Sequence, residues 1–327
     1  LPIILISVGG LLHKKKLFGK YSSIPWISLG AISISLQILA GHPEIVAYSL
    51  IIGSSYAAWH SLNLIFSNHR KDLLRIVFHM VLLIFFGLLL GAIQLFPLIE
   101  AGANNFRVDT ASLTEVREWG YPVRRIITLF IPNFFGNPSH HGYFDWFSQN
   151  WTPVSTNILG EQISTIDWGI KNYVEGGMYV GILPLLLVII ALTKYFHTKG
   201  LVLNNHPDIG FFLVLTVLSL SFVFGTPLYA LIYYMPGLGQ LHSPFRWVWP
   251  LTICLATLAA YGTDGLRHSK QSDKKVSHIM LARISMWIGA IVTLSMFLVY
   301  MFFNSLEPML DRALWNLAQA SKSFADT

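Results

Sequence analysis

The chain has 327 residues, of which 54% are hydrophobic and only 12% are charged, and its mean hydropathy is +0.56. Soluble globular domains carry roughly 25% charged residues, so this composition excludes an ordinary soluble protein and predicts an integral membrane protein. The formal charge of +6 would favour nucleic acid as the partner of a soluble protein. In a membrane protein the positions of the cations matter more than their sum, and we expect no nucleic-acid partner.

Apolar runs of nearly spanning length recur along the chain. The first, at 1–12, is shorter than the ~20 residues that a membrane helix needs, and lysines follow it where a signal peptide would carry them in front. We interpret this run as the end of a truncated helix and the sequence as a central piece of a longer protein. Seven further runs lie at 24–41, 45–66, 76–99, 178–193, 210–236, 247–263 and 284–303. Because backbone groups in lipid must be satisfied within each segment, we predict an all-α membrane protein with about eight transmembrane helices.

The segments that connect these runs alternate between two sides with opposite charge. The first set of segments is 13–20, 68–75, 194–208 and 264–283, and the second set is 42–44, 100–177, 237–246 and 304–327. The first set holds 14 Lys and Arg against 4 acidic residues, and the second holds 8 against 12. The positive-inside rule therefore places the first set in the cytoplasm. We predict a multi-pass protein of the bacterial cytoplasmic membrane, with transmembrane helices over 1–99 and 178–303 and extracytoplasmic segments at 100–177 and 304–327.

The stretch His42-Pro43-Glu44 interrupts an apolar run and predicts a tight turn on the outer side. Pro43 cannot continue the preceding helix, and Gly41 eases the reversal of the chain. His42 and Glu44 are candidate substrate-binding residues. Two candidate ligands are too few for a metal site, and exposure to water in the turn explains both residues as well.

The outer segment 100–177 is long enough to have structure or a function of its own. Ser112 and Glu115 have the spacing of a capping box, which predicts a helix start. A second helix is expected after Pro122, with an apolar face opposite or beside Arg124 and Arg125 that lies in the plane of the lipid headgroups. The residues of this face are Val123, Ile126, Ile127 and Phe130. The Gly-, Asn- and aromatic-rich stretch that follows predicts irregular structure.

Two groups of polar residues near Glu100 are candidates for chemistry. Pro97 is expected to kink the helix that ends at Glu100 and to turn this carboxylate toward a cavity, where it could accept a proton from a sugar hydroxyl or bind a metal. The alternative is a helix-end residue facing water. Arg107 is a candidate ligand for an anion, and Asp109 is a candidate ligand for a sugar or a metal. The alternative is that the two residues form an ion pair on the surface.

Arg246 follows Pro244 at the expected outer start of a membrane helix. Unpaired amides and the helix dipole favour an anion there, such as a lipid phosphate, and His242 could join the site. An arginine that reaches the headgroups beside Trp247 and Trp249 is an equal alternative. There is no Walker motif and no chain of charges within the apolar runs, which disfavours ATP-driven and ion-coupled transport.

Five stretches occur in the order found in YfhO-type bacterial membrane proteins, which resemble the GT-C class of polytopic glycosyltransferases. They are LAGHPEIVAYS at 39–49, GAIQLFPLIEAGANNFR at 91–107, LFIPNFFGN at 129–137, YVGILPLLL at 179–187 and MPGLGQLHSPFRWVWPLTICLATLAAYGTDGL at 235–266. The resemblance covers nearly the whole chain.

The resemblance implies an enzyme that transfers a sugar from a polyprenyl-phosphate donor to an envelope glycopolymer or glycolipid acceptor. The transfer would take place on the outer face of the membrane, and membrane lipids would be further partners. The resemblance also implies that the main catalytic carboxylate lies upstream of Leu1 and that Glu100 is a secondary candidate. Glu100 and Arg107 would line the cavity and Arg246 would hold the donor phosphate. The chemistry of such a transfer needs a cation that stabilises the leaving phosphate, which is either an arginine or a divalent metal ion. The alternative is a non-catalytic transporter of lipid-linked sugars or an assembly factor for envelope polymers.

Overall fold

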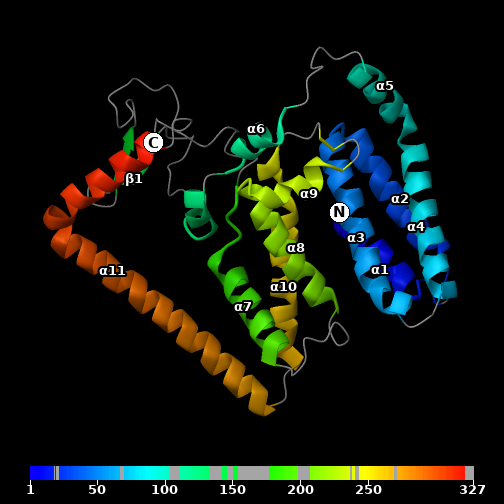
Figure 1. The fold of residues 1–327 in the computed structure, drawn as a ribbon. Coiled ribbons are helices and arrows are strands. Elements are labelled where there is room, and N and C mark those ends of the chain that lie inside the picture. The colour runs from blue at the N-terminus through cyan, green and yellow to red at the C-terminus, as the bar shows by residue number, and fades with distance from the viewer. Residues whose placement is uncertain are drawn as a thin grey trace. The chain divides into compact units, whose positions relative to one another are not determined.

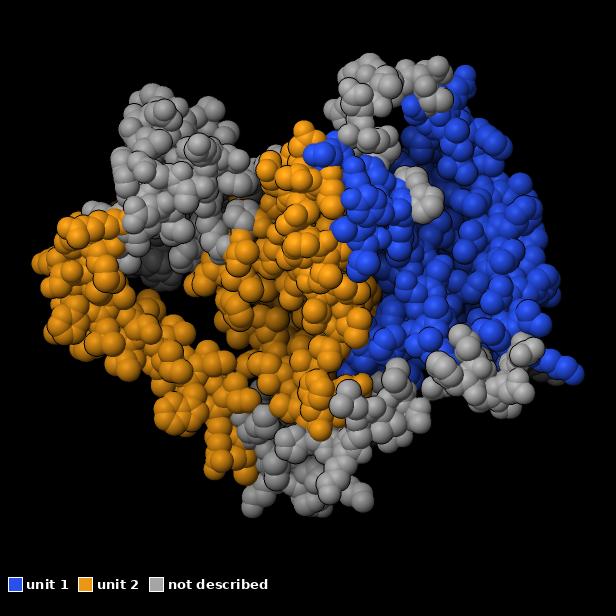
Figure 2. All heavy atoms as spheres, viewed as in Figure 1, with its two compact units in different colours: residues 1–112, 202–211, 230–242 blue, residues 113–201, 212–229, 243–327 orange. Residues whose placement is uncertain are grey.

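The computed structural model describes residues 1–17, 19, 22–66, 70–103, 111–121, 123–132, 142–145, 150–153, 177–197, 207–235, 238–239, 243–268 and 271–320. These residues are mainly helical, and they belong to two compact units (Figures 1 and 2). Unit 1 comprises 1–112, 202–211 and 230–242, and unit 2 comprises 113–201, 212–229 and 243–327. The helical fold class is therefore confirmed.

Five helices form most of the described part of unit 1. They are α1 (Pro2–Leu12), α2 (Ile24–Leu39), α3 (Pro43–Phe66), α4 (Arg70–Leu90) and α5 (Ala92–Ala103). The first residues of α8 (Pro207–Val223) and α9 (Ala230–Tyr233) also belong to this unit. Its interior holds the apolar side chains of Val8, Ile34, Ile52 and Leu83. The turn between α2 and α3 is where the sequence predicts it, and Gly41 has a φ of +76° there.

Glycines let α2 and α4 approach closely in unit 1. A Cβ at Gly87 would lie 2.7 Å from Ile34, and a Cβ at Gly91 would lie 2.7 Å from Ile38. Gly87 and Gly91 are one helical turn apart and so lie on the same face of the helix. This small-xxx-small spacing lets backbones pack without intervening side chains, which matters in lipid because lipid tails are as apolar as leucine.

Unit 2 combines helices with a short hairpin. It contains α6 (Leu113–Glu118), the 3-10 helix η1 (Val123–Leu129), β1 (Gly142–Asp145), β2 (Asn150–Pro153), α7 (Ile182–His197), most of α8, the 3-10 helices η2 (Pro227–Tyr229) and η3 (Pro244–Trp247), α10 (Val248–His268) and α11 (Gln271–Ala320). α7 packs along α10, where Gly262 lies against the backbone of Leu187.

The β-hairpin corrects the prediction of irregular structure after residue 132. β1 and β2 pair antiparallel, with Tyr143 opposite Thr152 and Phe144 opposite Trp151. Aromatic and β-branched residues facing one another across two strands stabilise such a pair, and the composition rich in Gly and Asn hid this signal.

Two predicted helices are broken in the structure. The run 76–99 is divided at Gly91 into α4 and α5, and Pro97 lies inside α5. The run 210–236 is divided after α8, and the following segment Pro227–Tyr233 is bent away by 105°. Both breaks occur at or near a glycine, and at Gly225 the positive φ of +59° ends the helix.

Two helical stretches among the described residues are long and apolar enough to cross a membrane, Lys71–Leu90 and Ala282–Met309. The bent pair formed by α8 and Pro227–Tyr233 would be a third if it acts as one span. Four other apolar helices are shorter, namely Pro2–Leu12, Ile24–Leu39, Ala92–Gly102 and Ile182–Thr193. The number of eight spans stays a prediction.

We expect Gly262→Ala to destabilise the protein by about 1–3 kcal/mol, because the new Cβ would meet the Leu187 carbonyl and force α7 away from α10. Gly289→Ala is the matched control, since a Cβ there would have nothing within 4 Å and alanine favours a helix. Thermal unfolding of the detergent-solubilised protein, followed by intrinsic fluorescence, measures both. Equal melting temperatures for Gly262→Ala and wild type would contradict this packing.

Candidate functional site

The end of α8 organises the polar groups at one end of unit 2. The N–H of Gly225 bonds to the carbonyl of Phe222 at 2.9 Å, and the N–H of Thr226 bonds to that of Ser221 at 3.1 Å. These two bonds and the left-handed glycine form a Schellman motif. The Tyr121 N–H then donates to the Val223 carbonyl at 2.7 Å, so the helix end also holds the segment that follows α6.

α6 is fixed directly on this helix end. Arg117 Nε donates to the Gly225 carbonyl at 2.9 Å, and Gly120 lies on the backbone of Gly225, where a Cβ would be 2.6 Å from the Gly225 nitrogen. The Arg117 guanidinium thereby satisfies a carbonyl freed by the helix break, and its positive charge is favourable at a helix C-terminus. As predicted, α6 begins directly after Ser112.

Two arginines flank a buried pair of aromatic rings beside this contact. The guanidinium carbon of Arg125 lies 5.0 Å from the centre of the Tyr121 ring, and the Tyr121 and Phe245 ring centres are 5.6 Å apart. The guanidinium carbon of Arg246 is 5.8 Å from the centre of the Phe245 ring. Arg125, Tyr121, Phe245 and Arg246, called the arginine–aromatic row below, thus come from η1, η3 and the segment before η1. Cation–π attraction of this kind is strongest where water is excluded.

Arg125 is a residue that sequence reasoning did not select for the site. Arg125 is only 6% exposed, whereas Val123 and Ile126 of the same 3-10 helix, and Phe130 directly after it, are exposed. The expected apolar face of η1 is therefore on the surface, and Arg125 points into the unit. The only sequence signal was a charge next to an apolar face, which more often indicates a solvated residue.

Arg246 lies in η3, the single turn that leads directly into α10, and Pro244 is at the start of that turn. Its backbone N–H donates to the Ser243 carbonyl at 3.0 Å, and its side chain is half-buried. Glu100 is exposed on α5 and belongs to unit 1, whereas Arg246 belongs to unit 2. Arg107, Asp109 and His242 lie outside the described residues.

His42 and Glu44 differ in exposure although they share the α2–α3 turn. His42 is exposed, but Glu44 is only 6% exposed, and Tyr48 Oη donates a hydrogen bond to Glu44 Oε1 at 2.8 Å. The interpretation of both residues as facing water is therefore wrong for Glu44. Tyr48 follows Glu44 by one helical turn, which brings the two side chains onto the same face of α3.

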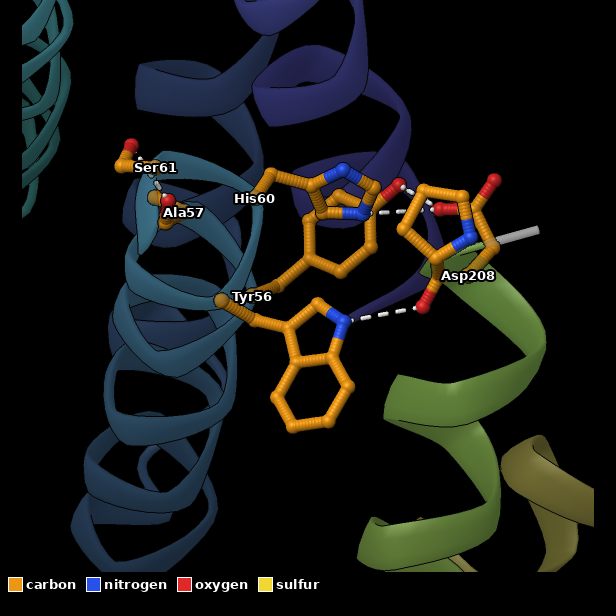
Figure 3. Close-up of polar contacts among 7 residues, drawn as sticks. Tyr56, Ala57, His60, Ser61 and Asp208 are labelled. Atoms are coloured by element: carbon orange, nitrogen blue, oxygen red, sulfur yellow. Dashed lines mark hydrogen bonds and ion pairs between the residues drawn. The ribbon is translucent and has the colours of Figure 1, made fainter. Parts of the chain in front are cut away.

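A second polar cluster joins α3 to the first turn of α8 within unit 1 (Figure 3). Tyr56 Oη donates to Asp208 Oδ1 at 2.6 Å, and His60 Nε2 lies 2.9 Å from the same oxygen. Trp59 Nε1 donates to the Pro207 carbonyl at 2.9 Å. The Tyr56–Asp208 distance is that of a hydroxyl bonded to an ionised carboxylate, and a negative charge is also stabilised in the first turn of a helix.

His13, at the end of α1, extends this cluster. Its ring meets the His60 ring edge-on, with centres 5.4 Å apart. Burial lowers the pKa of His13 below its ordinary value of 6.5, His60 and Lys15 lower it further, and Asp208 opposes them. No sequence pattern indicated this cluster, because 148 residues separate His60 from Asp208 in the chain.

The described residues offer no ready metal site. Within the part of the chain that the structure describes, no group of three His, Cys, Asp or Glu side chains is placed to hold a metal ion. The adjacent residues His140 and His141 lie outside that part. Comparisons with known proteins found no matching family model, no matching curated protein and no matching solved structure.

We expect the stability of the protein to fall as the pH drops below about 6.5, because His13 binds its proton less readily when folded than when unfolded. At pH values between the two pKa values the unfolded chain binds more protons, so acid favours unfolding. His13→Gln should flatten this part of the curve of melting temperature against pH, measured from about pH 5 to 7.5. His42→Gln, in an exposed turn, is the control and should leave the curve unchanged.

Proposed function

We propose that this chain is part of a GT-C-like membrane glycosyltransferase that moves a sugar from a polyprenyl-phosphate donor to an envelope acceptor. The observation that carries the proposal is the arginine–aromatic row, in which Arg125 and Arg246 are held at one end of unit 2 by buried rings. Guanidinium groups fixed in a region of low dielectric suit a phosphate leaving group. The motif order of YfhO-type proteins and the charge asymmetry of the loops support the same proposal.

The proposed arrangement in the membrane follows from the apolar runs. In this arrangement each of the eight apolar runs predicted from the sequence is one span, the first of them truncated, and the cationic connections face the cytoplasm. The arginine–aromatic row and the segment 100–177 then lie at the outer face of the bacterial cytoplasmic membrane. A polyprenyl-phosphate donor would reach the row from the lipid, with its phosphate at headgroup depth.

In the proposed reaction a carboxylate accepts the proton of the acceptor hydroxyl, and the hydroxyl oxygen bonds to the anomeric carbon of the donor sugar. The bond between this carbon and the phosphate oxygen breaks, and the polyprenyl phosphate leaves with the electron pair. Arg246 stabilises the charge that develops on the phosphate, and Arg125 adds a second positive charge nearby. Among the residues of this sequence, the resemblance to YfhO-type proteins gives Glu100 as a secondary candidate for this carboxylate.

The second candidate is a transporter of lipid-linked sugars that uses the same residues for binding alone. This candidate is favoured by the break after α8, where the segment Pro227–Tyr233 is bent by 105° relative to α8. Discontinuous helices form substrate sites in many transporters, near the points where the helices are interrupted. An assembly factor for envelope polymers would use the site in the same way.

We expect a strain that lacks the gene to lose one sugar modification of its envelope glycolipids or glycopolymers, as measured by mass spectrometry. Wild type should restore it, whereas Arg246→Ala should lower it by about 10²-fold or more, the typical effect of removing a donor that stabilises a developing negative charge. Glu100→Gln should also lower it.

Arg267→Ala, at an exposed position near the end of α10, is the matched control and should restore the modification fully. Immunoblots of the membrane fraction check that each variant is present at the wild-type level. An unchanged glycan profile in the deletion strain would contradict the transferase proposal and favour transport or assembly.

The proposed orientation predicts different accessibility for two engineered cysteines. In a Cys254→Ala background, Ser139→Cys should react with a membrane-impermeant maleimide in intact cells, whereas Ser272→Cys should react only after permeabilisation. The charge asymmetry of the loops places these residues on opposite sides. Labelling of Ser272→Cys alone in intact cells would reverse the orientation.

A further inference from the structure

A group of cations surrounds one carboxylate where α1 ends and α4 begins in unit 1. Asp72 Oδ1 lies 3.5 Å from Lys14 Nζ and 3.1 Å from Arg75 Nη1. Lys71 is exposed one residue before Asp72, and Lys15 and Lys16 are exposed after Lys14. A single shared carboxylate leaves these two helix ends with a clear excess of positive charge among their described residues.

Lys14 adopts a backbone conformation that glycine usually supplies. It has a φ of +47° and follows α1, and the Lys15 N–H bonds back to the Gly10 carbonyl at 3.0 Å. The end of α1 therefore has the geometry in which a left-handed residue reverses the chain, and a lysine is less favourable there than a glycine. The lysine side chain at this position reaches Asp72 at the start of α4.

An exposed apolar stripe runs along α4 from this cationic end. Lys71 and the exposed residues spaced three or four positions beyond it lie on one face of the helix. The apolar members of the stripe are Leu74, Phe78, Val81 and Phe85, all of them exposed. The same helix contains Lys71–Leu90, one of the two described stretches that are long and apolar enough to cross a membrane.

We propose that the cationic end and the apolar stripe of α4 together form a binding surface for one anionic phospholipid. The phosphodiester of the lipid lies among Lys14, Lys71 and Arg75, and an acyl chain lies along the stripe that begins at Leu74. Cations next to a membrane helix attract anionic headgroups, and the apolar residues below them are compatible only with lipid tails or another apolar surface.

The side of the membrane on which this surface lies favours phospholipid over the donor lipid of the proposed function. By the charge asymmetry of the loops this end of α4 faces the cytoplasm, opposite to the arginine–aromatic row. The inference therefore rests on the membrane location within the proposed function, but it does not depend on sugar transfer. Asp72 would position the two neighbouring cations, since it contacts both Lys14 and Arg75.

Native mass spectrometry of the detergent-solubilised full chain tests this surface with phosphatidylglycerol, and with phosphatidylcholine as the neutral lipid. We expect wild type to prefer phosphatidylglycerol and the double variant Lys14→Gln/Lys71→Gln to bind it about tenfold more weakly. This variant leaves the Asp72–Arg75 pair in place. Arg267→Gln/Arg283→Gln removes the same charge from exposed positions in unit 2 and should change binding less than twofold.

Three results would overturn the inference. One is an equal loss of binding in both double variants, which would indicate a general effect of charge. Another is equal binding of the two lipids by wild type. The third is displacement of phosphatidylglycerol by glycerol 3-phosphate at similar concentrations, which would show a site for free phosphate. Failure of the protein to insert into liposomes would instead contradict the membrane location on which the proposed function also depends.

Discussion

The break of α8 at Gly225 is the constraint on which the polar end of unit 2 depends. A helix that stops there leaves carbonyl groups without partners within the helix, and such groups are costly when buried. The backbone of Tyr121 and the side chain of Arg117 supply two of the missing donors. Because Gly120 and Gly225 have no side chains, α6 can approach closely enough for these bonds to form. Tyr121 is then held against Phe245, and the two arginines take their places beside the rings.

The two units use glycine in the same way but for different packing partners. In unit 1, Gly87 and Gly91 pack against the side chains of Ile34 and Ile38. In unit 2, Gly262 packs against the backbone of Leu187. Close backbone approach increases van der Waals contact, which is the main force between helices surrounded by lipid. The glycines at these helix contacts therefore contribute directly to helix association, in addition to the role of other glycines in turns.

The described polar clusters illustrate two ways in which neighbouring groups stabilise a charged side chain. Asp208 is held by a tyrosine hydroxyl, a neighbouring histidine and the start of its own helix. Arg125 is instead held against an aromatic face. The first arrangement joins segments that are 152 residues apart in the sequence, and it fixes the start of α8 to α3. The second joins residues that are close in sequence and orients η1, so its apolar side chains remain on the surface.

The sequence by itself determined the helical class, the turn at Gly41 and the start of α6 after Ser112, because apolar periodicity, glycine and capping residues act over a few neighbouring positions. It could not reveal the hairpin, the break at Gly91 or the burial of Glu44, since these depend on which segments face one another. Only the tertiary structure brought His60 to Asp208 and turned Arg125 inward. Both outcomes follow from packing between distant segments, and a local pattern of charge and hydropathy carries no information about that packing.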